Sequence, residues 1–130
     1  MRTLIERSAP SVIDHGRVGQ PQLFEAKARA QLHYYVGHWP EVDCIAARES
    51  AMLRCVPLTS TAAVFGDEAK DYCVRVPGDP QAARTQRVAA GIAIRLLQAQ
   101  ASSRARLSSV TPNLESETWH QVATRWLAEF

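Results

Sequence analysis

Apolar residues recur at helical spacing along much of the chain, and the first such stretch covers residues 21–36. Its apolar positions lie three or four residues apart, which places them on one face of a helix. Gly37 suits the end of that helix. A second stretch with the same spacing covers residues 40–55 and stops before Pro57, because the residue before a proline avoids helical geometry. The two stretches predict a helical hairpin.

The pattern changes over residues 58–77, where β-branched and aromatic residues become frequent. Residues 72–76, Tyr-Cys-Val-Arg-Val, alternate as a half-buried strand does. The polar stretch 66–71 contains glycine and acidic residues, so it predicts a turn. We therefore expect a β-hairpin over 58–77, with a short helix over 61–71 as the alternative. Residues 1–20 are expected to be irregular or weakly extended, with short strand candidates at 3–6 and 11–14.

A further helix is predicted over residues 80–101. The preceding Pro-Gly-Asp-Pro sequence interrupts regular structure, Asp79 can cap a helix, and Pro80 is tolerated in its first turn. A projection at about 100° per residue separates two faces. One face carries Arg84, Arg87, Gly91, Arg95 and Gln98, and the opposite face carries Ala82, Ala89, Ala93, Leu96 and Leu97.

A last helix is predicted over residues 111–130, where the strongest apolar stripe of the chain consists of Trp119, Val122, Trp126 and Phe130. We expect these aromatic side chains, and Tyr34, Tyr35 and Trp39, to fill the core. The alternative is that they form an interface, since Trp and Tyr are enriched at binding hot spots.

These segments predict a mainly α fold of about four helices, with a small β-hairpin between the second and third helices. No repeat or long linker interrupts the 130 residues, so a single domain over 1–130 is expected. The alternative is a compact α+β domain, in which the N-terminal strand candidates join the hairpin.

Composition places the chain among ordinary globular proteins, with 46% hydrophobic and 22% charged residues. No apolar run reaches the length of a membrane span or a signal peptide, so we expect a cytoplasmic protein without membrane contact. The three cysteines are widely spaced and odd in number, which argues against a disulfide framework or a zinc site. Cys44 and Cys55 lie in apolar surroundings and are expected to be small buried hydrophobes.

Positive charge is concentrated in one part of the chain. Residues 80–114 hold five arginines and no acidic residue, so this stretch carries +5 while the rest sums to −3, giving the net +2. Such an asymmetry indicates an anionic partner, although a solvated basic helix has the same composition. The candidate partner-binding residues are Arg84, Arg87, Gly91, Arg95, Arg104 and Arg106.

Catalytic patterns are sparse. No nucleophile elbow, phosphate-binding glycine loop or zinc-protease motif is present, and His33 and His38 are five residues apart, which does not place them on one helical face. The E-x-K sequence at Glu25 and Lys27, with Asp14 upstream, resembles in a minimal way the PD-(D/E)xK motif of metal-dependent nucleases; a second E-x-K lies in residues 67–70. No cofactor or metal site is predicted.

The sequence therefore favours a small non-enzymatic interaction protein, such as an inhibitor, adaptor or antitoxin-like regulator from a bacterium, phage or other mobile element. Its partner is expected to be an acidic macromolecular surface, a protein before a nucleic acid, bound through the arginine-lined helix; a homodimer is also open. The first alternative is a nucleic-acid-binding regulator using residues 80–106. The second is a small Mg²⁺-dependent nuclease.

Overall fold

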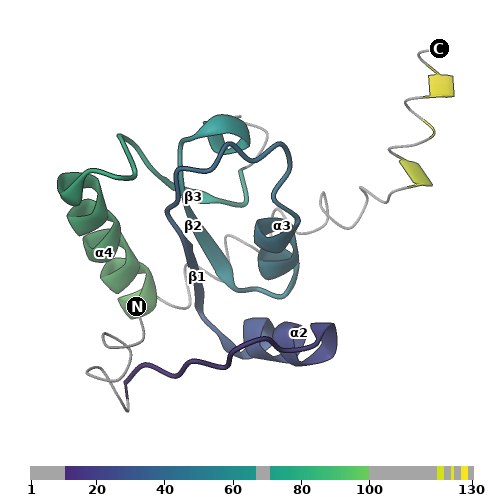
Figure 1. Cartoon of the computed structure of the whole chain (residues 1–130), viewed down its shortest axis with the longest axis horizontal. Helices are drawn as coiled ribbons and strands as arrows, with labels where there is room; N and C mark the ends of the chain where they lie inside the picture. The colour runs from purple at the N-terminus through teal and green to yellow at the C-terminus, as the bar shows by residue number, and fades with distance from the viewer. Residues whose placement is uncertain (1–10, 67–70, 100–119, 122–123, 125–126, 129–130) are drawn as a thin grey trace.

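A computed structural model describes residues 11–66, 71–99, 120–121, 124 and 127–128 of the chain. The elements are, in order, α2 (Gln20–Arg29), β1 (Leu32–Tyr35), α3 (Ile45–Met52), β2 (Val56–Ser60), the 3₁₀ helix η1 (Ala63–Gly66), β3 (Val74–Val76) and α4 (Ala83–Gln98). The strands form one sheet in the order β1-β2-β3, and both pairings are parallel (Figure 1).

This architecture contradicts the predicted mainly α fold. The described part of the chain has three α-helices and a three-stranded parallel sheet, whereas four helices and an antiparallel hairpin were expected. The compact α+β alternative fits. Parallel neighbours cannot be joined by a tight turn, so β1 reaches β2 through α3, and β2 reaches β3 through the segment that contains η1.

The predicted helix over 21–36 is wrong in its second half, because α2 ends at Arg29 and β1 follows at once. In β1, His33 bonds to Ser50 of α3 on one side of the sheet, and Tyr34 bonds to Gln86 of α4 on the other. This alternation is that of a strand. The helix predicted over 40–55 is likewise shortened to α3. No helix of the described residues is long and apolar enough to cross a membrane.

The predicted hairpin over 58–77 is wrong, because β2 and β3 run parallel. A hairpin needs antiparallel strands joined by a turn, whereas these two strands are joined by a crossover connection. Pro57, which was read as a helix stop, lies inside the central strand β2. The Val56 amide donates to Gln31 on the β1 side, so the nitrogen of Pro57 faces the β3 side. Pairing with β3 begins only at Leu58. The missing N–H of Pro57 therefore removes no hydrogen bond from the sheet.

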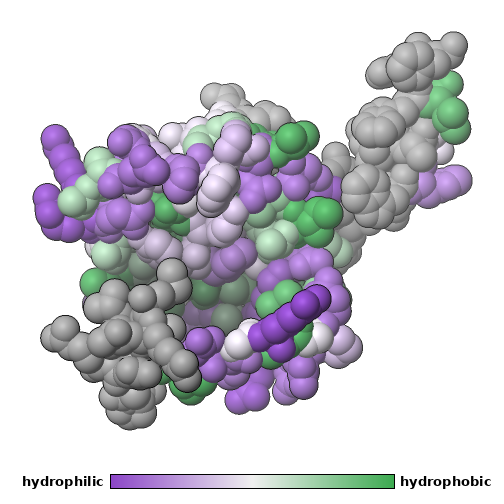
Figure 2. All heavy atoms as spheres, viewed as in Figure 1, coloured by the Kyte–Doolittle hydropathy of each residue, from purple (hydrophilic) through white to green (hydrophobic). Residues whose placement is uncertain are grey.

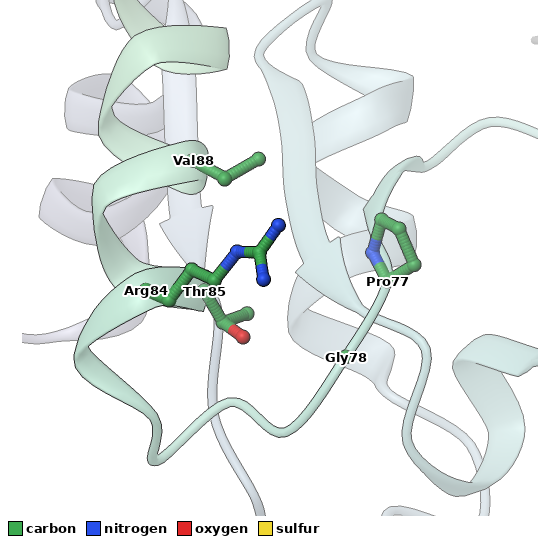
Figure 3. Close-up of a pocket in the computed structure, with 5 residues that line it drawn as sticks. All are labelled: Pro77, Gly78, Arg84, Thr85 and Val88. Carbon is green, nitrogen blue, oxygen red and sulfur yellow. The ribbon is translucent and has the colours of Figure 1, made fainter.

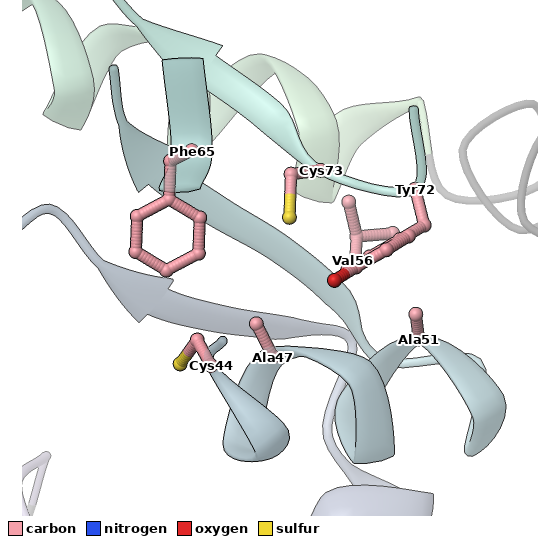
Figure 4. Packing of buried hydrophobic residues seen from close by; sticks show 7 residues of the cluster. All are labelled: Cys44, Ala47, Ala51, Val56, Phe65, Tyr72 and Cys73. Atoms are coloured by element: carbon pink, nitrogen blue, oxygen red, sulfur yellow. The ribbon is translucent and has the colours of Figure 1, made fainter. Parts of the chain in front are cut away.

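Side chains cover the sheet on both faces, and all five residues of β2 are buried. On one face lie α3 and η1, whose cluster with β2 and β3 consists of Cys44, Ala47, Ala51, Val56, Phe65, Tyr72 and Cys73 (Figure 4). All three cysteines are buried, which confirms the predicted burial of Cys44 and Cys55. Small residues on α3 let this short helix approach the sheet closely.

The opposite face of the sheet is covered by α4 (Figure 1). Its buried cluster consists of Val36, Leu58, Val76 and Ala89, and the half-buried Ile92, Ala93 and Leu96 pack against it. The sheet thus lies between α4 and the α3 layer, as in proteins whose parallel strands are covered on both faces.

One buried hydroxyl lacks a partner in this arrangement. Thr59 is fully buried in β2, and its Oγ1 has no hydrogen-bond partner among the described residues. Replacing Thr59 by Val keeps the branched shape and removes the unsatisfied hydroxyl, so we expect Thr59→Val to raise the free energy of unfolding by about 1 kcal/mol. Urea unfolding followed by circular dichroism measures the change. The control is Thr61→Val, at an exposed position just after β2, which should change the free energy of unfolding little. A Thr59→Val variant that is less stable than the wild type would contradict the absence of a hydrogen bond at Thr59 Oγ1.

Candidate functional site

The position of α4 is fixed by one side chain that the sequence analysis did not single out. Gln86 donates from Nε2 to the carbonyl oxygens of Pro80 (2.6 Å) and Val36 (3.2 Å). Its Oε1 accepts a hydrogen bond of 2.7 Å from the Tyr34 hydroxyl. These bonds join the first turns of α4 to the end of β1, so the helix begins beside the carboxyl ends of the strands. A single glutamine offers no sequence signal for this role.

Arg84, Arg87 and Arg95 are exposed on the outer side of α4. None of them takes part in an ion pair among the described residues. In the space-filling view, the visible surface at the upper left, where Figure 1 draws the start of α4, is largely hydrophilic (Figure 2). Gly91 lies between them along the helix, and a Cβ there would meet no atom within 4 Å. We call these four residues the arginine stripe. Arg104 and Arg106, also predicted as partner-binding, lie outside the described residues.

Helix α4 is shorter than the predicted helix over 80–101, and the face that it turns toward the sheet differs from the predicted apolar face. It begins at Ala83, because Asp79 and Pro80 form a turn before it: the Gln81 amide donates to Asp79 Oδ1 at 2.9 Å. Thr85 and Ala89 are its buried residues, whereas Leu97, expected on the inner face, is 45% exposed. Val88 and Ile94 are also exposed, at 44% and 56%. The outer surface of α4 therefore mixes guanidinium groups with apolar side chains.

A pocket of about 420 Å³ lies where the β3–α4 loop meets the start of α4, lined by Pro77, Gly78, Arg84, Thr85 and Val88. Figure 3 shows the Arg84 and Val88 side chains extending from α4 toward the loop that carries Pro77 and Gly78. The pocket adjoins the arginine stripe and shares Arg84 with it. The sequence contained the Pro-Gly-Asp-Pro turn, but nothing in it indicated a pocket.

A second polar cluster joins α2, β1 and α3 on the other side of the sheet. The Lys27 side chain is only 10% exposed; its Nζ lies 2.6 Å from Glu49 Oε2 and donates to the Ala46 carbonyl oxygen at 3.2 Å. The buried Ser50 hydroxyl donates to the same oxygen at 2.8 Å and lies 2.9 Å from His33 Nδ1. The Lys27 charge is thus satisfied within the fold. This cluster attaches α2 to the rest of the molecule.

These contacts bear on the nuclease alternative. Glu25 and Lys27 lie on the helix α2 and not on a strand, and Glu25 lies 3.7 Å from Arg29 in an exposed ion pair. Asp14 accepts a hydrogen bond of 2.8 Å from the Gly16 amide. The strand-borne E-x-K that this chemistry needs is therefore not formed by Glu25 and Lys27. The other E-x-K lies outside the described residues, among which no group of three His, Cys, Asp or Glu side chains could hold a metal ion.

The loop between β1 and α3 is held by Tyr35, whose hydroxyl donates to Glu41. This hydrogen bond, with burial, raises the pKa of Tyr35 to about 12. The next residues of the loop are exposed: Trp39 is 66% exposed and stacks on His38 at a ring distance of 5.0 Å. The expectation that Trp39 fills the core is therefore wrong.

The comparisons with known proteins identify no relative: no protein family, curated protein or solved structure matches this chain.

The polar cluster predicts a pH dependence of stability. Burial, and then the nearby Lys27 charge, lower the pKa of His33 below its ordinary value of 6.5. The folded state therefore holds a neutral imidazole at pH values where the unfolded chain already binds a proton. The neutral His33 therefore contributes to the free energy of unfolding above about pH 6.5. This contribution is lost as the pH falls from there toward the lowered pKa of His33.

We expect the wild-type chain to lose stability relative to His33→Asn as the pH is lowered from about 8 to about 5. The asparagine keeps a neutral group that can bond to Ser50 and cannot take up the proton. Urea unfolding at each pH gives the two curves. His38→Asn, in the exposed loop, is the control and should follow the wild type; parallel curves for His33→Asn and wild type would contradict the buried neutral histidine.

Proposed function

We propose that the chain is a small, cytoplasmic, non-enzymatic interaction protein that binds an acidic surface of a protein partner through the arginine stripe of α4. The observation that carries the proposal is the exposure of Arg84, Arg87 and Arg95 on one helix without a carboxylate partner among the described residues. Arginine forms bidentate hydrogen bonds with carboxylates. A second polypeptide with acidic side chains would therefore supply the carboxylates that the described residues do not place beside these guanidinium groups.

A protein partner is favoured over a nucleic acid by the apolar side chains of the same surface. Val88 and Ile94 are 44% and 56% exposed on α4, and at about 100° per residue both lie next to the stripe. Protein interfaces bury such side chains at their centre, whereas a phosphate backbone offers them no apolar contact. The stripe is also short: eleven residues separate Arg84 from Arg95, or about 16 Å of helix. Three cations over that length would neutralise few phosphates and give weak, salt-sensitive binding to DNA.

The test is a charge reversal of the stripe. We expect the Arg84→Glu, Arg87→Glu, Arg95→Glu triple variant to remain folded, since exposed substitutions usually change stability by about 0.5 kcal/mol or less each. The same variant should lose an acidic protein that the unmodified chain captures from a lysate of its host. Quantitative mass spectrometry of the captured proteins, with circular dichroism of each variant, measures both results.

A matched control makes the same change of charge elsewhere. Arg17, Arg29 and Arg54 are exposed and lie outside α4, so their reversal to Glu should leave the captured protein unchanged. Equal loss in both triple variants would reduce the effect to net charge and contradict the proposal. Random-sequence duplex DNA, titrated by fluorescence anisotropy at two salt concentrations, tests the other partner class: tight binding that the stripe variant loses would favour the nucleic-acid-binding alternative.

A substitution of Gly91 is expected to change the stability of the fold and the binding of the partner in opposite directions. Alanine is favoured over glycine inside a helix by about 1 kcal/mol, and a Cβ at this position meets no atom of the fold within 4 Å. We expect Gly91→Ala to raise the free energy of unfolding by about that amount and to weaken capture of the partner, because the methyl group occupies space at the centre of the stripe. If Gly91→Ala is more stable but captures the partner as well as the wild type does, the partner does not contact α4 at Gly91.

A further inference from the structure

The pocket beside the arginine stripe lies in a place where parallel sheets commonly hold ligands. It is formed by the loop that leaves the carboxyl end of β3 and by the first turns of α4. In open sheets with helices on both faces, ligands bind outside the carboxyl ends of the strands. With a volume of about 420 Å³, the pocket is within the range of about 300–1,000 Å³ that small-molecule sites occupy.

A threonine in the wall of this pocket has a hydroxyl without a partner in the fold. Thr85 is 7% exposed, and its side chain lines the pocket (Figure 3). Among the described residues its Oγ1 makes no hydrogen bond, although the hydroxyls of Ser50, Ser60 and Thr124 do. Thr85 Oγ1 is not among the fully buried atoms without a partner, so the hydroxyl is accessible from the pocket. A ligand in the pocket can therefore exchange a hydrogen bond with Thr85 Oγ1 without breaking one inside the fold.

The first turn of α4 lies next to the pocket, because Arg84 and Thr85 line it. Its N-cap is Ala82, whose side chain offers no acceptor to the amides of the first turn. The first free amide groups of a helix carry partial positive charge and bind anions. Arg84 belongs to this turn and brings a full positive charge to the pocket, and no acidic residue lines it. The Thr85 hydroxyl and the Arg84 guanidinium are thus two donors in the wall of the pocket, beside the start of α4.

Gly78, in the loop before α4, leaves the Thr85 hydroxyl open to the pocket. The residue has φ +104°, in the region that side chains rarely adopt, and a Cβ there would lie 3.0 Å from Thr85 Oγ1. A larger residue would thus cover the hydroxyl and close the pocket from the loop side. Glycine keeps the backbone near Thr85 while leaving the hydroxyl reachable.

We propose that this pocket binds a phosphate monoester of a small organic molecule. The phosphate is held by the Arg84 guanidinium, the Thr85 hydroxyl and the first amides of α4, because arginine and helix N-termini are the usual ligands of phosphate. The volume exceeds that of a phosphate group alone, and the remaining wall is formed by the rings and methyl groups of Pro77 and Val88. The organic part of the ligand lies against this apolar wall.

The test uses phenyl phosphate as the probe, with the full 130-residue chain, in isothermal titration calorimetry. We expect saturable binding of phenyl phosphate, weaker binding of inorganic phosphate and none of phenol. Arg84→Gln should weaken binding of phenyl phosphate about tenfold or more, as expected when a charged hydrogen-bond donor is lost. Thr85→Val, which keeps the packed shape, should weaken it several-fold with circular dichroism unchanged.

The matched control is Arg87→Gln, which removes the same charge from the same helix outside the pocket. It should change binding by about twofold or less, since an exposed charge at a distance is screened. Absence of phenyl phosphate binding at millimolar concentration would overturn the site. So would equal losses in Arg84→Gln and Arg87→Gln, which would indicate non-specific attraction to the stripe. Thr85 has no part in the proposed protein interface. An unchanged affinity of Thr85→Val for phenyl phosphate would therefore count against the phosphate site alone, and a loss of partner capture would be a separate result.

Discussion

The complete burial of β2 is the constraint on which the rest of the structure depends. All five residues of Val56–Ser60 are buried, which requires cover on both faces of the strand and a neighbouring strand along each edge. The chain supplies β1 and β3 as neighbours, α3 and η1 over one face, and α4 over the other. Because this strand is buried on both faces, its sequence shows no alternation of apolar and polar residues that would distinguish it from a short buried helix.

That ambiguity explains which parts of the fold were predictable. The segment of α4 was identified, because sixteen residues give enough turns for two faces to separate and because the turn before it is marked by proline and glycine. The strands have three to five residues, too few for a period to be read. In residues 21–36, apolar positions at helical spacing ran on from α2 into β1. Pro57 favours a helix stop in the sequence, although in the structure it lies in β2, one residue before the pairing with β3 begins.

The candidate site was predictable only where it is local in sequence. The arginines of α4 follow from one helix, so their common side could be found by projection. The pocket combines α4 with the β3–α4 loop, and the position of α4 depends on Gln86 bonding to Val36, fifty residues away. The contact between Lys27 and Glu49 likewise joins separate helices. Such pairings are decided by how the layers pack, which a single sequence records only indirectly.

The two proposals for α4 are physically linked through Arg84. This residue lines the pocket and is the first cation of the arginine stripe. A phosphate bound in the pocket would neutralise part of the charge that an acidic partner needs, leaving Arg87 and Arg95 as the remaining cations. Because coupling between two sites is reciprocal, the partner would reduce the affinity for the phosphate by the same factor. Opposition between the two ligands is therefore a consequence of the shared guanidinium and requires no change in the fold.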